Sequence, residues 1–105
     1  MPFYLHQWNY KDPQVKTMVA GTEDRAEVVR LATEAFGGKL HSFFYCFGEY
    51  DGVAISEYPD QVTALASLMS IFGEGRTIGI HTTVLFPPEE TMRAIKLAHE
   101  IVVGT

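Results

Sequence analysis

Along this 105-residue chain, hydrophobic positions recur with one of two spacings, either every second residue or every third or fourth residue. Segments in which aromatic or β-branched residues recur at every second position predict strands over residues 3–10, 39–50, 53–58 and 77–86. Apolar residues spaced three or four apart predict helices over 24–36 and 60–73, and a terminal helix from 87 onward. A shorter turn or helical segment is expected between Asp12 and Gly21.

Residues at the helix boundaries support these assignments. Asp24 with Glu27 three positions later forms a partial capping box, and Gly37-Gly38 supplies a left-handed stop. Asp60 is the expected cap of the next helix. The apolar stripes contain Val28, Val29, Ala32, Ala35 and Phe36; Val62, Leu65, Ala66, Met69 and Phe72; and Met92, Ile95, Leu97, Ala98, Ile101 and Val102.

The predicted order of elements is strand, helix, strand, strand, helix, strand, followed by a terminal helix. This order is typical of the α+β class with a ferredoxin-like βαββαβ arrangement, an antiparallel sheet with two helices on one face. In such a sheet the first strand lies between the third and the fourth. No linker, repeat or low-complexity tract interrupts the pattern, so residues 1–105 are predicted to form a single domain.

Composition narrows the classes of function. The formal net charge is −5 and the basic residues are scattered, which argues against a nucleic-acid partner. No apolar run approaches the ~20 residues that cross a bilayer, and no signal peptide is visible, so a cytoplasmic protein without a membrane partner is expected. Cys46 is the only cysteine, which excludes an intrachain disulfide, and we expect it to be a small buried residue inside a strand.

A short segment between the second and third predicted strands carries a family resemblance. Residues 48–55, with Glu57 and Pro59-Asp60, resemble the signature region of GYD-domain proteins. Further matches are Asn9, Gly37-Gly38-Lys39-Leu40 and Arg76-Thr77, and together they cover about residues 2–90. Asp51 precedes a glycine in this segment, so we expect it to have a structural role in a turn.

The resemblance implies a dimeric α+β barrel, in which two sheets meet face to face, with a pocket inside the barrel or between sheet and helices. It implies no particular activity, since proteins of this barrel group differ widely in function. Two positions depart from the family pattern. His6 stands where an aliphatic residue is usual, and His81 stands where an acidic residue is usual.

Side chains of a strand alternate between the two faces of a sheet, so each predicted strand divides into two sets. An almost wholly apolar set is expected to lie beneath the helices: Leu5, Leu40, Phe44, Cys46, Val53, Ile55, Ile78, Ile80 and Val84. The other set is aromatic and partly polar: Tyr4, His6, Trp8, His41, Phe43, Tyr45, Phe47, Ala54, Ser56, Gly79, His81 and Thr83. A face of this kind is expected to be a dimer interface or a binding site.

Three of the four histidines fall in the aromatic set. His6 and His81 are predicted to be neighbours on adjacent strands, with Ser56 nearby, and imidazole groups titrate near neutral pH. We therefore take His6 and His81 as candidate acid–base residues. The candidate ligand-binding residues are Tyr4, Trp8, His41, Phe43, Tyr45, Ser56 and Thr83. No metal site is predicted, because a third histidine ligand would require His41 to approach across the sheet.

Two hypotheses of function remain open. In the first, the protein binds a compact organic molecule in a cavity on the sheet face, and histidine acid–base chemistry gives a cofactor-independent isomerase or lyase. No cofactor motif is present, and none is expected. In the second, the protein is a non-catalytic homo-oligomeric module that binds a ligand or a partner, and its aromatic face is mainly a dimer interface. A cavity of a few hundred Å3 beside His6 would favour the first hypothesis or a binding role.

Overall fold

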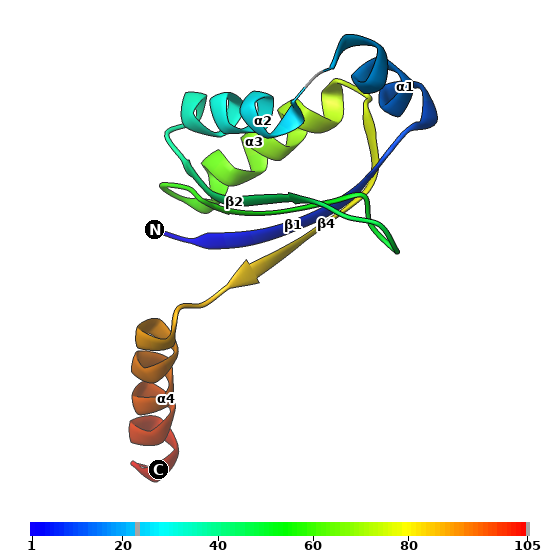
Figure 1. Ribbon diagram of the computed structural model, residues 1–105. Coiled ribbons are helices and arrows are strands. Elements are labelled where there is room, and N and C mark those ends of the chain that lie inside the picture. The colour runs from blue at the N-terminus through cyan, green and yellow to red at the C-terminus, as the bar shows by residue number, and fades with distance from the viewer. Residues whose placement is uncertain (23, 105) are drawn as a thin grey trace.

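The computed structural model describes residues 1–22 and 24–104, apart from the side chain of Phe72, and has an α+β architecture (Figure 1). Phe72, which the pattern assigned to an apolar stripe, therefore lies outside the described side chains. The elements are β1 (Phe3–Tyr10), α1 (Asp12–Gly21), α2 (Arg25–Ala35), β2 (Lys39–Tyr45), β3 (Gly52–Glu57), α3 (Gln61–Gly73), β4 (Thr77–Leu85) and α4 (Pro88–Val103).

The described strands form one antiparallel sheet in the order β2-β3-β1-β4. This order and the α+β class confirm the ferredoxin-like prediction, including the place of β1 between β3 and β4. Helices α2 and α3 lie side by side over one face of the sheet, and α1 lies near one end of it (Figure 1). Helix α4 lies on the other side of the sheet and extends away from the body of the molecule.

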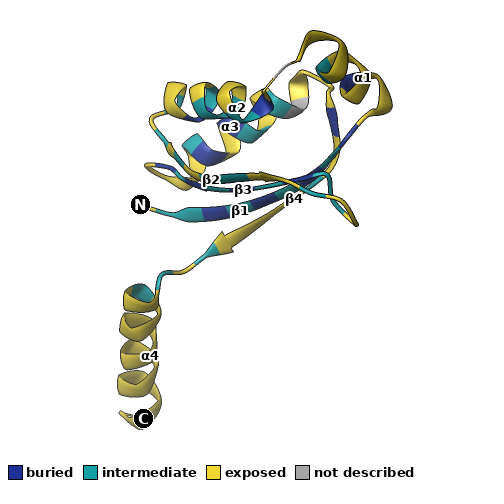
Figure 2. Cartoon of the chain, in the orientation of Figure 1, coloured by how far each residue is buried: buried dark blue, intermediate teal, exposed yellow. Residues whose placement is uncertain are grey.

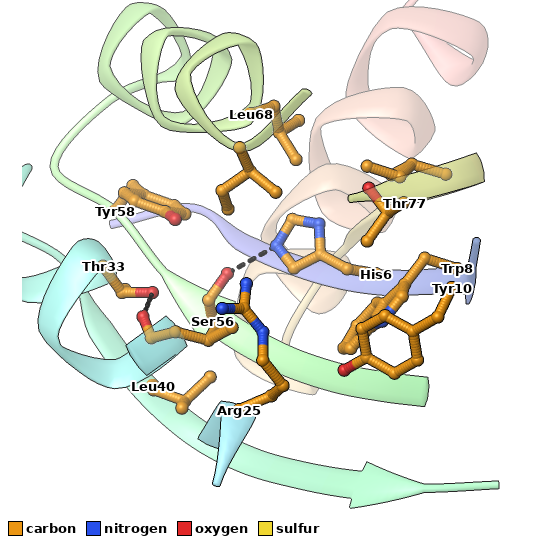
Figure 3. Close-up of a pocket in the computed structure, with 13 residues that line it drawn as sticks. His6, Trp8, Tyr10, Arg25, Thr33, Leu40, Ser56, Tyr58, Leu68 and Thr77 are labelled. Atoms are coloured by element: carbon orange, nitrogen blue, oxygen red, sulfur yellow. Dashed lines mark hydrogen bonds between the residues drawn. The ribbon is translucent and has the colours of Figure 1, made fainter. Parts of the chain in front are cut away.

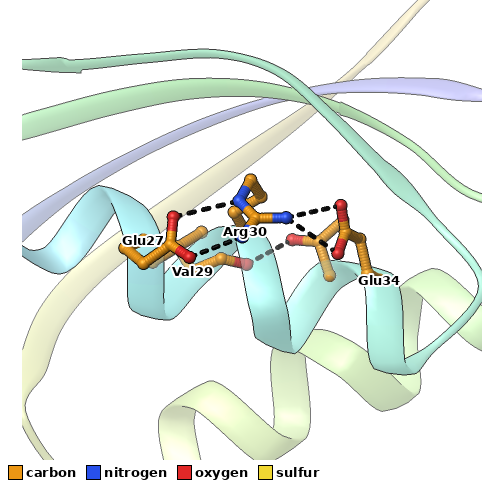
Figure 4. A network of polar contacts seen from close by, with 5 residues as sticks. Glu27, Val29, Arg30 and Glu34 are labelled. Carbon is orange, nitrogen blue, oxygen red and sulfur yellow. Dashed lines mark hydrogen bonds and ion pairs between the residues drawn. The ribbon is translucent and has the colours of Figure 1, made fainter.

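The helix boundaries follow the capping residues that the sequence indicated. The Asp24 carboxylate accepts a hydrogen bond from the Ala26 backbone N–H at 3.0 Å. The Asp60 carboxylate accepts one from the Thr63 N–H at 2.7 Å and another from its hydroxyl at 2.8 Å. On the solvent side of α2, Arg30 bridges two glutamates of the same helix (Figure 4). Such exposed pairs add little to stability.

The second strand is shorter than predicted. The aromatic pattern extends to Tyr50, but β2 ends at Tyr45, and residues 46–51 form a loop before β3. Asp51 holds this loop in place, because its carboxylate accepts a hydrogen bond from the Tyr10 N–H at 2.9 Å and its own N–H donates to the Trp8 carbonyl at 2.9 Å. The structural role expected for Asp51 is thus confirmed. Cys46 lies in the loop and is half-buried, so its placement inside a strand was wrong.

Along β1 and β3 the two faces of the sheet are the reverse of the prediction. Burial alternates along β1, and the buried positions beneath the helices are Tyr4, His6, Trp8 and Tyr10. The aromatic and polar face is therefore the covered one, and Leu5 points to the uncovered face. The prediction that the apolar set lies under the helices was wrong for Leu5 and Phe44, among others, whereas Leu40 and Ile80 of that set do lie on the covered face. The alternative in which the aromatic face is a dimer interface was also wrong, because the chain's own helices cover that face.

Two β-bulges explain why strict alternation failed along β2 and β4. One lies between Leu40 and Ser42 of β2, and the other interrupts the pairing of β1 with β4 between Gln7 and Asn9. An extra residue in one strand reverses which positions face the helices. Gly79 sits at the second bulge with φ of +60°, a backbone conformation that glycine adopts without steric cost.

Two of the histidines lie on the uncovered face. His81 is paired with Gln7, one position from His6 on β1, and therefore points away from the helices. His41 is the unpaired residue of the β2 bulge, and its Nε2 is hydrogen-bonded with the Glu57 carboxylate at 2.9 Å. The predicted gathering of three histidines on one face was wrong. Thr83, opposite Leu5, also lies on the uncovered face.

Large apolar side chains remain exposed on the uncovered sheet face and on α4 (Figure 2). Phe44 and Ile78 on the sheet are 65% and 50% exposed, and Ile95 and Ile101 on α4 are 53% and 61% exposed. No buried residue is found along α4. Among the described residues, no helix has the length and apolar character that a bilayer span requires. The uncovered face and α4 are thus two of the surfaces that the chain leaves unpacked.

Candidate functional site

A small cavity lies between the covered face of the sheet and the helices α2 and α3 (Figure 3). Its volume is about 40 Å3. Its polar lining consists of His6, Tyr10, Arg25, Thr33, Ser56, Tyr58 and Thr77, and its apolar lining of Trp8, Val29, Leu40, Leu68, Ile71 and Ile80. Ordinary ligand pockets measure roughly 300–1,000 Å3, so this one admits only a molecule of a few non-hydrogen atoms.

His6 lies in the floor of the cavity with both ring nitrogens engaged. Nε2 is hydrogen-bonded with the Ser56 hydroxyl at 2.7 Å, and Nδ1 with the Thr82 hydroxyl at 3.1 Å. Burial lowers the pKa of His6 from 6.5 to about 4. The imidazole is therefore neutral at pH 7, with one nitrogen donating and the other accepting.

Arg25 brings a charged group into the same space. It is the first residue of α2 and only 3% exposed, and its guanidinium points into the cavity near Ser56 (Figure 3). Its backbone N–H donates to the Tyr45 hydroxyl at 2.9 Å, and that hydroxyl donates to the Asp24 carboxylate at 3.2 Å. The start of α2 is thus fixed to β2. A guanidinium stays protonated at all ordinary pH values, so the wall carries a permanent positive charge.

Two hydroxyl groups in the wall make no hydrogen bond to any described residue. They belong to Tyr10, on β1, and Thr77, the first residue of β4, and both atoms are buried. Burial raises the pKa of Tyr10, and the neighbouring Trp8 and Arg25 counteract that rise. A buried polar group without a partner costs about 1–3 kcal/mol. These two hydroxyls therefore favour water or a ligand inside the cavity.

The sequence-predicted candidates divide into three groups in the structure. His6, Trp8 and Ser56 line the cavity together. Tyr4, Phe43 and Tyr45 share the covered face but stand outside the cavity wall; the Tyr4 ring stacks on His6 with 6.2 Å between centroids. His41, His81 and Thr83 lie on the opposite face. The His81 ring instead meets Tyr50, 5.7 Å between centroids, so His6 and His81 cannot act on one molecule in this cavity.

Sequence reasoning missed the contribution of α2. Arg25, Val29 and Thr33 recur every fourth residue, which places them on one side of a helix, and all three line the cavity. Thr33 is fully buried, and its hydroxyl donates to the Val29 carbonyl at 2.8 Å. The spacing of Arg25 from Val29 and Thr33, on the same side of one helix, is the sequence signal that could have identified it.

Within the described part of the chain, no group of three or more His, Cys, Asp and Glu side chains is arranged to hold a metal ion.

Comparison with protein families matches residues 4–95 to the model described as the GYD domain. Neither a curated protein nor a solved structure matches the chain. Every residue that lines the cavity lies within the segment that matches this family model.

Proposed function

This chain belongs to the GYD-domain family, and from that premise and the geometry of the cavity we propose that it binds a compact organic molecule beside His6. The observation that carries the proposal is the pair of buried hydroxyls, on Tyr10 and Thr77, that line the cavity without a described partner. A ligand with oxygen or nitrogen atoms would satisfy them. The apolar lining, including Leu68 and Ile71, would contact the rest of the ligand.

Binding is better supported than catalysis. Proton transfer of the isomerase or lyase type would rest on His6 alone, since His81 is on the other face. With a pKa of about 4, His6 is a weak base near neutral pH, whereas an efficient acid–base catalyst titrates near the working pH. In the binding role, neutral His6 and the Ser56 hydroxyl orient the ligand by hydrogen bonds.

The test uses Trp8, which lines the cavity and is the only tryptophan of the chain. Small acids, amides, alcohols and amines are titrated while Trp8 emission and the melting temperature are recorded. Val29→Ile adds one methylene to the cavity wall and should weaken any true ligand about tenfold. Val28→Ile, the same change at the next and more exposed position of α2, should have no effect.

Two results would contradict the proposal. One is that no compound changes either signal. The other is that Val29→Ile binds the active compound as well as the unaltered protein does, which would place binding elsewhere. Circular dichroism of both variants checks that α2 and the sheet are intact, so a loss of binding reports on the cavity itself.

We further propose that a second copy of the chain covers the unpacked surfaces. Stacked sheets lie about 10 Å apart, and a helix of 16 residues is about 24 Å long. If two copies met through their uncovered faces, each α4 would extend past the partner's sheet along its side. The exposed Phe44, Ile95 and Ile101 would then be buried, and both chains would contribute the same surfaces, as two-fold symmetry requires.

Sedimentation velocity tests this assembly. The unaltered chain should sediment as a dimer, and Phe44→Glu on the sheet or Ile95→Glu on α4 should shift it toward the monomer. Lys96→Glu, on the charged side of α4, is the matched control and should leave the dimer in place. A monomeric unaltered chain, or a dimer insensitive to both apolar replacements, would overturn the assembly without affecting the cavity.

A further inference from the structure

The Tyr10 hydroxyl has polar neighbours that can donate a hydrogen bond to it but cannot accept one. Tyr10 is 7% exposed, and its hydroxyl makes no hydrogen bond to any described residue. Trp8 and Arg25, the side chains that counteract the rise of the Tyr10 pKa, carry N–H donors and no acceptor. The proton of the Tyr10 hydroxyl therefore lacks an acceptor, and a ligand atom with a free lone pair would supply one.

The charges in the wall leave no free counter-charge for an ion. In the described part of the chain, Arg25 is the one permanently charged residue that lines the cavity. Its Nη2 lies 3.8 Å from a carboxylate oxygen of Glu74, and Arg25 makes a further interaction within the chain. His6 is neutral at pH 7, because burial lowers its pKa to about 4. A cation or an anion would leave water without a partner of its own, a cost that an uncharged molecule does not incur.

The side of the cavity away from Tyr10 is apolar or already hydrogen-bonded. The Thr33 hydroxyl donates to a backbone carbonyl of its own helix, and the Tyr58 hydroxyl is hydrogen-bonded with that of Ser67 at 2.8 Å. Figure 3 shows Thr33 and Tyr58 on this side, with Leu68 of α3 nearby. This part of the wall suits a short alkyl group.

We propose that the ligand is an uncharged short-chain carbonyl compound, a ketone or an aldehyde, whose oxygen accepts a hydrogen bond from the Tyr10 hydroxyl and whose alkyl part lies toward Leu68. A carbonyl oxygen has lone pairs and no proton, which suits a place where the neighbouring groups are donors. The volume of about 40 Å3 limits the alkyl part to a few carbons. This inference rests on the proposed binding function and names the ligand class.

A series of probes with the same number of non-hydrogen atoms separates charge from hydrogen bonding. Acetone, isopropanol, acetate and isopropylammonium are titrated at neutral pH and constant ionic strength against the isotope-labelled chain. The readout is the indole N–H resonance of Trp8, whose ring centroid lies 6.2 Å from that of Tyr10. Acetone should bind about threefold more tightly than isopropanol, whose hydroxyl proton would meet other donors. It should bind at least about tenfold more tightly than either ion.

Removal of a single hydroxyl group assigns the effect to the residue. Tyr10→Phe should weaken acetone about threefold to tenfold, because one hydrogen bond is lost. The matched control is Tyr4→Phe, the same change on the same strand, where the hydroxyl is also buried without a described partner but lies outside the cavity wall. This control should leave the affinity unchanged. Neither change should lower the melting temperature of the ligand-free protein, because each removes a buried polar group that has no partner.

The outcomes separate this inference from the function on which it rests. If isopropanol, acetate or isopropylammonium binds as tightly as acetone, the carbonyl assignment is overturned and a binding cavity stands. The same holds if Tyr10→Phe binds acetone as tightly as the unaltered chain does, or if only another compound of the wider screen binds. If no compound binds at all, the proposed function fails as well. Should Tyr10→Phe not fold, the comparison of acetone with the other probes on the unaltered chain still decides.

Discussion

Each face of the sheet carries a histidine, and the two histidines differ in their exposure to solvent. His6, on the covered face, is 8% exposed and has both nitrogens hydrogen-bonded to hydroxyl groups. His81, on the adjacent strand, is exposed and contacts one tyrosine ring. Burial therefore gives His6 a neutral imidazole inside a cavity, whereas His81 faces outward. Coverage by helices, more than the identity of the residue, decides which histidine can hold a ligand.

The aromatic residues show the same contrast. Trp8 packs against Tyr10, Phe43 and the backbone of Gly52, where a Cβ atom would lie 2.4 Å from the Trp8 ring. Phe44, on the uncovered face of β2, is 65% exposed. One face is thus a closed packing layer with a small cavity, and the other is an apolar surface without a partner in a single chain.

Truncation of one aromatic side chain on each face should give the largest difference between the two faces. Trp8→Ala should lower the free energy of unfolding by about 3–5 kcal/mol, because a large buried ring leaves a void. Phe44→Ala should lower it by less than about 1 kcal/mol and should act mainly on self-association. Urea denaturation followed by circular dichroism measures both. Equal losses would mean that the two faces are equally packed.

Acid pH should test the covered histidine. The unfolded chain protonates His6 near pH 6.5, whereas the folded chain resists protonation until about pH 4. The stability that neutral His6 contributes is therefore complete above pH 6.5 and is lost as the pH falls toward 4, by about 3 kcal/mol in all. His6→Gln should flatten this dependence in urea denaturation between pH 6.5 and 4.5. His81→Gln should retain it, and a similar slope in both variants would exclude His6 as the cause.

A smaller effect is expected from the hydroxyl that holds the imidazole. Ser56→Ala removes the partner of His6 Nε2 inside the protein and should cost about 1–3 kcal/mol of unfolding free energy. Thr83→Ala removes a hydroxyl from the exposed face of β4 and should cost less than about 1 kcal/mol. Thermal and urea denaturation compare the two. A larger loss for Thr83→Ala than for Ser56→Ala would contradict the assignment of faces.

The smallest effect should come from the hydrogen bond between His41 and the Glu57 carboxylate. The two side chains are 31% and 20% exposed, so solvent and salt weaken their attraction. Glu57→Gln should change the free energy of unfolding by less than about 1 kcal/mol, and the difference should shrink further in high salt. A loss as large as that of Ser56→Ala, unaffected by salt, would show that the uncovered face is buried in solution by a second chain.

The sequence by itself determined the order of the elements, their approximate boundaries and the family. These features depend on interactions within a few residues, such as the Asp24 and Asp60 caps, the apolar period of the helices and the GYD segment. The same local logic overextended the second strand to Tyr50, because aromatic alternation continues after the pairing with β3 has ended at Tyr45.

Only the tertiary structure decided which face the helices cover and which histidine enters the cavity. Bulges and registers depend on how two distant strands pair. The β2 bulge puts His41 on the face opposite to Phe43, and the pairing of His6 with Thr82 leaves His81 on the uncovered face. Arg25 reached the cavity because α2 packs over the covered face along β2, which brings its first residue to the cavity wall. Local periodicity places a side chain on one side of its own helix or strand, but the packing of distant segments determines which residues that side contacts.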